Sequence, residues 1–278
     1  KFPLYKDEFD RRIAMSIEYD GDAYNGWQTQ NSGVPTIQQT LEAALSKIAN
    51  HPVKVICSGR TDTGVHASNQ IIHFDTCAER KLFGWGAGVN KNLPRDISVN
   101  WVKEVPLSFH ARFSAQKRRY RYLIYSNEYK HAILASGVTW ERRKLDVSLM
   151  HNAAQYLLGT HDFSSVRAVG CQAHSPVKTV TDISVQAYGG LVVLDIEANS
   201  FLYHMVRNIV GLLIPIGAKE KPVDWIKDVI AGRDRAMAGV KALPNGLYFV
   251  AATYDNAFQL PQRALGPFFL PDQLDPPV

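Results

Sequence analysis

The chain has 278 residues, of which 46% are hydrophobic and 21% are charged, and its formal net charge is +5 at pH 7. This length allows one large domain or two ordinary ones, and the composition is typical of a soluble globular protein. No apolar run approaches the roughly 20 residues of a membrane-spanning helix, so we expect no membrane partner. The basic charge weakly favours polyanionic partners.

The spacing of the cysteines and the absence of cofactor motifs limit the kinds of site that the chain can form. Cys57, Cys77 and Cys171 are odd in number and widely spaced. They argue against a disulfide framework and against a zinc site, and they favour a reducing, cytoplasmic location. The chain has no phosphate-binding or dinucleotide-binding glycine loop and no paired metal-binding histidines. We therefore expect any enzyme built on it to need no metal or organic cofactor.

The first half predicts the element order β-α-β-β-α-β. Alternating β-formers indicate a strand over residues 12–18, and Thr36 with Gln39 resembles a capping box before a helix. The remaining elements are strands over 53–57 and 70–74, a helix over 82–89 and a strand over 97–102. Gly-bounded residues 19–30 between the first strand and helix suit a packed loop or an RNA contact, and packing is the better interpretation.

The second half predicts the same order again. Its elements are a strand over 119–125, a helix capped by Asp146, a hairpin of strands 180–187 and 192–198 across Gly189-Gly190, helices from Met205 and over 225–230, and a strand over 247–254. Two ferredoxin-like subdomains of an α+β fold, residues 12–110 and 111–255, are the simplest account. Residues 1–11 are then an N-terminal tail, and the proline-rich residues 256–278 are a C-terminal tail without regular structure.

One loop combines charged and hydroxyl side chains between two glycines. Residues 57–67 read Cys-Ser-Gly-Arg-Thr-Asp-Thr-Gly-Val-His-Ala and follow a predicted buried strand. Asp62 can be a nucleophile, an anchor for an arginine or the cap of a turn. A turn cap is the commonest role of an aspartate in such a loop, although it would not need Arg60 beside it.

Residues 117–122 form a basic and aromatic strand. Tyr120 and Tyr122 share one face, and Arg119 and Arg121 share the other. An arginine row can follow phosphates while an aromatic face stacks a base, but core tyrosines with solvated arginines fit equally well. Further along, Arg207 stands among apolar residues, where an arginine needs a carboxylate partner.

Together these residues resemble the TruA family of tRNA pseudouridine synthases. The matching segments are residues 19–21, 26–28, 59–67, 109–115, 119–122, 161–165, 205–211, 246–248 and 266–270, in the family's order. The Arg-Thr-Asp-x-Gly-Val-His segment is highly specific. The resemblance implies one extended, mainly antiparallel sheet with a central RNA-binding cleft.

The resemblance also implies an activity and a site. The activity is isomerisation of uridine to pseudouridine at positions 38, 39 and 40 of the tRNA anticodon arm, by a homodimer without a cofactor. The family's catalytic aspartate corresponds to Asp62, its substrate-stacking tyrosine to Tyr120, the basic partner of the aspartate to Arg207, and the arginine that helps displace the base to Arg60.

The basic strand predicts RNA binding, and two alternative functions remain open. Arg119 and Arg121 are expected to bind RNA and to govern the salt dependence of its affinity. A non-catalytic RNA-binding module would need no constellation of Asp62, Tyr120 and Arg207. A nucleoside or glycoside hydrolase usually pairs two carboxylates, and the loop of Asp62 holds no second one.

Overall fold

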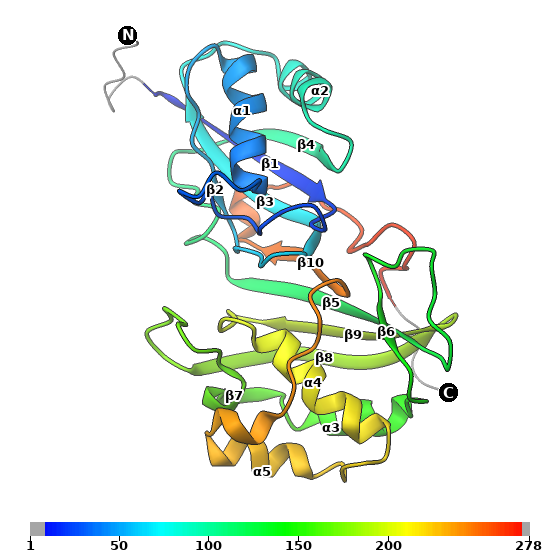
Figure 1. Cartoon of the computed structure of the whole chain (residues 1–278). Coiled ribbons are helices and arrows are strands. Elements are labelled where there is room, and N and C mark those ends of the chain that lie inside the picture. Colours follow the sequence, from blue (N-terminus) through cyan, green and yellow to red (C-terminus); the bar gives the residue numbers. More distant parts are fainter. Residues whose placement is uncertain (1–8, 274–278) are drawn as a thin grey trace. The chain divides into compact units, whose positions relative to one another are not determined.

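The computed structural model describes residues 9–273, which divide into two compact units. The first unit contains residues 9–116 and 249–268, and the second contains 117–248 and 269–273. Most of the predicted N-terminal tail, residues 1–11, lies outside the described residues, as do residues 274–278 of the predicted C-terminal tail. The elements of both units are labelled in Figure 1.

The first unit follows the predicted order of elements. They are β1 (Arg11–Tyr19), α1 (Ile37–Ala49), β2 (Ile56–Cys57), β3 (His66–Thr76), α2 (Leu82–Asn92) and β4 (Ile97–Val105), joined by β10 (Leu247–Thr253) from the other end of the chain. The strand order is β4-β1-β3-β10, with β2 also paired to β3. β1 runs antiparallel to both β3 and β4. β2 is shorter than the strand predicted over 53–57.

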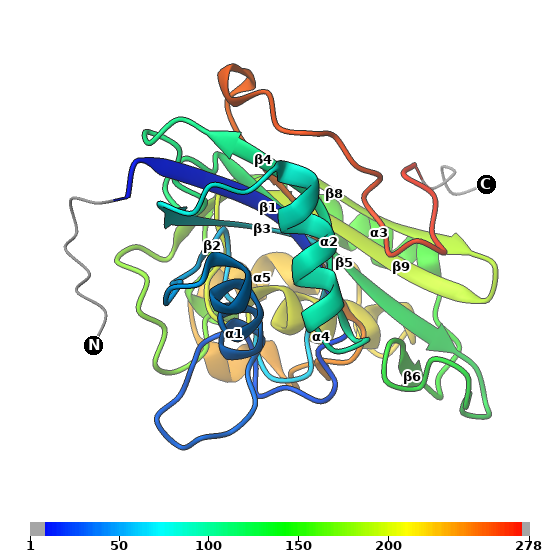
Figure 2. The same ribbon diagram turned by 90° about the horizontal axis from the view of Figure 1, so that it is seen from above.

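One face of this sheet carries the helices. Ile13 and Met15 of β1 are fully buried, and Phe74 of β3 packs edge-on against Trp85 of α2 with ring centroids 5.1 Å apart. Gly88 of α2 lies directly against a side chain of α1, so the two helices are neighbours (Figure 1, Figure 2). Alternation along β1 and β3 therefore sends one set of side chains towards the helices.

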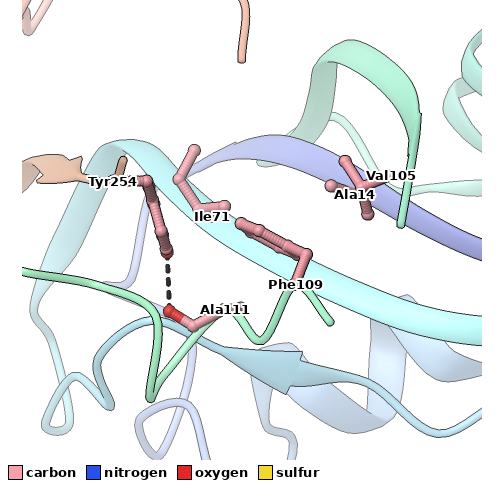
Figure 3. Close-up of a cluster of buried hydrophobic side chains, with 6 residues drawn as sticks. All are labelled: Ala14, Ile71, Val105, Phe109, Ala111 and Tyr254. Atoms are coloured by element: carbon pink, nitrogen blue, oxygen red, sulfur yellow. Dashed lines mark hydrogen bonds between the residues drawn. The ribbon is translucent and has the colours of Figure 1, made fainter. Parts of the chain in front are cut away.

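The other face holds a second buried cluster. Its members are Ala14, Ile71, Val105, Phe109, Ala111 and Tyr254 (Figure 3). The Tyr254 hydroxyl donates to the backbone oxygen of Ala111 over 2.6 Å. The segment that follows β4 is therefore fastened to the sheet face without helices.

The second unit contains the remaining elements. They are β5 (Lys117–Ser126), β6 (Thr139–Glu141), α3 (Val147–Gln155), β7 (Gly159–Asp162), β8 (Val177–Tyr188), β9 (Leu191–Ala198), α4 (Met205–Gly217) and α5 (Trp225–Gly232). The strand order is β5-β9-β8-β7 and all these neighbours are antiparallel, whereas β6 runs parallel to β5. Short 3₁₀ turns cover Ser164–Val166 and Arg235–Ala238 here and Asn256–Phe258 in the first unit.

The predicted caps and hairpin are confirmed. The Thr36 hydroxyl accepts the backbone N–H of Gln39, and the Asp146 carboxylate accepts that of Leu149. Gly189 turns the β8–β9 hairpin with a φ of 57°. Both units mix helices with mainly antiparallel strands, as an α+β fold requires. The short strands β6 and β7 were not predicted. Within residues 9–273, no helix has the length and apolarity needed to cross a membrane.

Candidate active site

Asp62 lies in the loop between β2 and β3, residues 58–65, here called the Asp62 loop. The backbone oxygen of Asp62 accepts the N–H of Val65 over 3.1 Å, and Gly64 has a φ of 76°. These features define a tight turn that starts at Asp62. The turn is closed by the backbone carbonyl, and the Asp62 carboxylate is half-buried.

A buried glutamine fixes the start of the Asp62 loop. Gln70 of β3 is fully buried, and its side-chain nitrogen donates to the backbone oxygen of Gly59 over 2.6 Å. Its side-chain oxygen accepts the Ser58 hydroxyl over 2.6 Å and the backbone N–H of Gly59 over 3.3 Å. Buried amide groups that satisfy a loop backbone in this way hold it in one conformation.

Tyr19 supports the middle of the Asp62 loop from β1. Its hydroxyl lies 2.8 Å from that of Thr61, and the Gln70 side chain donates to it over 3.4 Å. Burial raises the pKa of Tyr19, so the group stays a neutral hydroxyl. Thr61 immediately precedes Asp62, and the buried network therefore ends next to the carboxylate.

The glycine-bounded segment 19–30 packs against the Asp62 loop. The backbone N–H of Trp27 donates to the Thr61 oxygen over 3.0 Å, and the N–H of Gly64 donates to the Tyr24 oxygen over 3.4 Å. At Gly26, φ is 81°, and an added Cβ would lie 2.8 Å from the Thr61 oxygen. The favoured packing interpretation of this segment is confirmed.

Arg60 is exposed on the same loop. The nearby thiol of Cys57 is buried, and burial raises its pKa to about 12 although the charges of Arg60 and Arg112 act to lower it. The thiol is therefore protonated and unsuited to be a nucleophile at neutral pH. The loop presents a carboxylate and a guanidinium as its reactive and charged groups.

In the second unit, the tyrosines of β5 differ in environment. Tyr120 is half-buried and meets the Phe201 ring edge-on, with centroids 4.9 Å apart. Tyr122 is fully buried, and its hydroxyl bonds to the Thr139 hydroxyl and to the Leu243 backbone oxygen, each over 2.7 Å. Tyr120 is thus the more accessible ring of the two.

The arginines of β5 share a carboxylate. Arg119 and Arg121 contact the two oxygens of Asp195 on β9 over 2.6 and 2.8 Å, so both side chains lie on one face, as alternation predicts. Arg121 also donates to the backbone oxygens of Pro271 and Asp272 and has no exposed side-chain surface.

The expectation that Arg121 binds RNA is corrected by its burial. A guanidinium without exposed surface and with carboxylate and carbonyl partners cannot reach a phosphate in this conformation. The side chain of Arg119 is 22% exposed, and its role in RNA binding stays a prediction. Asp195 was missed because it lies far from Arg121 in the sequence.

Arg207 occupies the first turn of α4 and is 8% exposed. Its side chain donates to the Ala242 backbone oxygen over 2.8 Å. Burial raises the pKa of Tyr122 to about 12, while the nearby Arg207 charge opposes this rise. Asp62 belongs to the first unit, so its predicted pairing with Arg207 stays a prediction.

No metal centre is evident in the described part of the chain. Across residues 9–273, no three His, Cys, Asp or Glu side chains are grouped so that they could hold a metal ion. Nδ1 of His204 lies 3.1 Å from the Lys241 amine, and burial followed by neighbouring cations lowers the pKa of His204 to about 4. The expectation from the sequence that the chain needs no metal or organic cofactor stays a prediction.

Comparisons with known proteins identify relatives across almost the whole length. A family model described as tRNA pseudouridine synthase matches residues 15–114 and 153–255. Three relatives named tRNA pseudouridine synthase A illustrate the similarity. The Pseudomonas aeruginosa protein is 57% identical over 93% of this chain and 91% of its own length. The proteins of Pseudoalteromonas atlantica and Vibrio cholerae are 54% and 53% identical, over 94% and 95% of this chain and 99% and 100% of their own.

Proposed function

Because the chain belongs to the tRNA pseudouridine synthase family, we propose that it isomerises uridine to pseudouridine at positions 38, 39 and 40 of the tRNA anticodon arm, with Asp62 as nucleophile. The family acts on tRNA as an isomerase. The expected positions in tRNA and the homodimer follow from the resemblance already described, and the cytoplasmic location follows from the cysteine usage. The two-subdomain, ferredoxin-like interpretation is part of this proposal, supported by the β4-β1-β3 order with β2 paired to β3.

The reaction needs one reactive group and no redox chemistry. The bond from N1 of uracil to C1′ of ribose breaks, and a bond from C5 to C1′ forms. C5 loses a proton and N1 gains one, so the atoms of substrate and product are the same. A carboxylate can start this exchange by attacking the sugar or the base, or by removing a proton from C2′.

The rigid support of Asp62 is the observation that carries the proposal. Before Asp62, the Thr61 hydroxyl bonds to Tyr19, the Thr61 backbone oxygen accepts the Trp27 N–H, and the Gly59 oxygen accepts the Gln70 side chain. After it, the Gly64 N–H donates to the Tyr24 oxygen, and the Asp62 carboxylate itself is half-buried. A reactive group is most effective in catalysis when its neighbours hold it in the productive geometry before the substrate binds. A surface turn with no role in catalysis would not need these buried hydrogen bonds.

The other residues receive roles that suit their chemistry. A uridine inside a stem must leave the stack, at a cost of a few kcal/mol. Exposed Arg60 would fill the vacated space or hold a phosphate, and the Tyr120 ring would stack the extruded uracil. Arg207 would favour the ionised form of Asp62 by opposite-charge interaction. Arg119 would contribute to the affinity for RNA.

Replacement of Asp62 by asparagine tests the proposal. We expect Asp62→Asn to retain tRNA binding and to lose turnover, because the amide keeps the shape but not the nucleophile. Turnover is read by carbodiimide labelling and primer extension on unmodified tRNA, in which pseudouridine produces new stops at the three proposed positions. Asp22→Asn is the matched control, because Asp22 is an exposed aspartate of the same unit.

Four outcomes separate the alternatives. Near-normal activity of Asp62→Asn would show that the nucleophile assignment is wrong. Binding without stops in the unaltered protein would favour the RNA-binding module, and release of free uracil would favour a hydrolase. Stops at other uridines would contradict the anticodon-arm proposal alone.

A further inference from the structure

Residues 109–114, here called the 109–114 loop, alternate between burial and exposure. Phe109 and Ala111 are fully buried in the cluster on the sheet face without helices (Figure 3). Phe113, two residues further, is 77% exposed. The same loop therefore anchors itself in the core and presents an aromatic ring to solvent.

Two buried partners fix the anchored part of the 109–114 loop. The backbone N–H of Ala111 donates to Nδ1 of His73 over 3.0 Å, and its oxygen accepts the Tyr254 hydroxyl over 2.6 Å. His73 is 2% exposed and meets the Phe109 ring edge-on. Both polar groups of the Ala111 backbone are thus satisfied by side chains of the core.

His110 fixes the exposed part of the 109–114 loop, which carries Phe113. Its Nδ1 accepts the backbone N–H groups of Arg112 and Phe113 over 3.2 and 3.0 Å. The Ser114 hydroxyl accepts the His110 N–H, and the His110 oxygen accepts the Ser114 N–H, each over 2.9 Å. The exposed Phe113 is therefore held by a closed set of local hydrogen bonds, not carried on a loose chain.

The surface around Phe113 combines aromatic and cationic groups. The His110 ring stacks on it with centroids 4.3 Å apart and an interplanar angle of 26°. The exposed Arg112 places its guanidinium carbon 5.5 Å from the Phe113 ring centroid. Aromatic faces flanked by a guanidinium are the groups that proteins use to hold unpaired bases and their phosphates.

The 109–114 loop lies beside the strand that leads into the Asp62 loop. The Ala111 N–H donates to His73 of β3, and His73 is the register partner of Ile56 on β2. Because β2 ends at Cys57, the Asp62 loop begins directly after it.

We propose that Phe113 and Arg112 form a second RNA contact, in which the Phe113 ring stacks an unpaired base of the tRNA and Arg112 binds a phosphate beside it. This inference rests on the proposed function, because it takes tRNA as the ligand. It extends the recognition surface beyond the residues that surround the uracil. A single exposed phenylalanine is common on protein surfaces. Phe113 differs because its loop is held in one conformation and because the Arg112 guanidinium lies beside its ring.

Filter binding of unmodified tRNA to the whole protein tests the contact without turnover. We expect Phe113→Ala to weaken binding about tenfold, the effect of one lost base stack, and Phe113→Tyr to restore it. Arg112→Ala should weaken binding and reduce the slope of log affinity against log salt by about one. Phe83→Ala is the matched control, because Phe83 is 84% exposed in the same unit.

The outcomes are distinct from those of the catalytic test. An affinity of Phe113→Ala within twofold of the unaltered protein, or an equal loss in Phe83→Ala, would overturn the proposal. So would a change of oligomeric state in Phe113→Ala by light scattering, which would assign the ring to contacts between copies. If the chain is not a synthase, neither the unaltered protein nor any variant will form pseudouridine, and the binding result will stand unaffected.

Discussion

The hydroxyl groups of Tyr19 and Thr61 lie 2.8 Å apart in the buried region beneath the Asp62 loop. Tyr19 ends β1, whereas Thr61 directly precedes the proposed nucleophile. The Tyr19 hydroxyl also accepts a hydrogen bond from Gln70 of β3. Two strands of the sheet therefore hold the residue before Asp62 in place.

Removal of the Tyr19 hydroxyl should lower activity more than stability explains. Tyr19→Phe removes the Tyr19 partner of the Thr61 hydroxyl and one of the two acceptors of the Gln70 amide nitrogen, at about 1–2 kcal/mol. We expect kcat to fall about tenfold with little change in KM, because the loop moves while the RNA contacts remain. Tyr24→Phe is the control, since its hydroxyl bonds to Asp96 over 2.8 Å. Equal kcat losses in both variants would contradict a specific role for Tyr19.

Close packing at Gly26 should make it intolerant of a side chain. Gly26→Ala combines a φ of 81° with a Cβ only 2.8 Å from the Thr61 oxygen. We expect a loss of about 2–4 kcal/mol of unfolding free energy in urea melts, from strain and overpacking together. Gly33→Ala has a similar φ of 74° but open space around its Cβ, so it isolates the conformational cost of about 1 kcal/mol. A similar loss in both variants would show that the contact with Thr61 is unimportant.

Local features of the fold were predictable from the sequence. The caps at Thr36 and Asp146 depend on groups three residues away, so their residue types suffice to place a helix start. β7 (Gly159–Asp162) was missed because glycine and aspartate are poor strand formers, and pairing with β8 creates it.

In the candidate site, too, features set by a local motif were predictable, whereas features set by contacts between distant residues were not. A specific local motif pointed to Asp62, but its support by Gln70 depends on tertiary contacts that no spacing rule contains. The burial of Arg121 depends on Asp195 and on the backbone of residues 271–272, which are distant in sequence. An arginine in a basic run therefore looked solvated although it is a core residue.

The buried ion pair of Arg121 and Asp195 should dominate the stability of the second unit. Asp195→Asn leaves a fully buried guanidinium without its charge partner, and we expect a loss of about 3–5 kcal/mol in urea unfolding. Glu104→Gln is the control, because the pair of Arg11 and Glu104 is partly exposed and worth at most about 1 kcal/mol. A loss below 1 kcal/mol in Asp195→Asn would show that Arg121 finds another partner.

His73 links the 109–114 loop to pH. Its pKa is lowered to about 4, first by burial and then by the charges of Arg12 and His110, with Asp75 acting in the opposite direction. In its neutral form Nδ1 accepts the N–H of Ala111. Protonation of this nitrogen would end that hydrogen bond and bury a charge.

The folded protein should therefore lose stability on acidification through His73. Because the folded pKa lies below the unfolded value of about 6.5, the contribution is complete above pH 6.5 and is lost as the pH falls towards 4, by up to about 3 kcal/mol. Urea unfolding at pH 7.5, 5.5 and 4.5 measures it. His73→Gln keeps a neutral acceptor that does not titrate, so its stability should fall less steeply over this range. The carboxylates titrate in both proteins, and the difference between the two slopes isolates the histidine. Parallel slopes would mean that the pKa of His73 is the same in the folded and the unfolded protein, which would contradict the prediction.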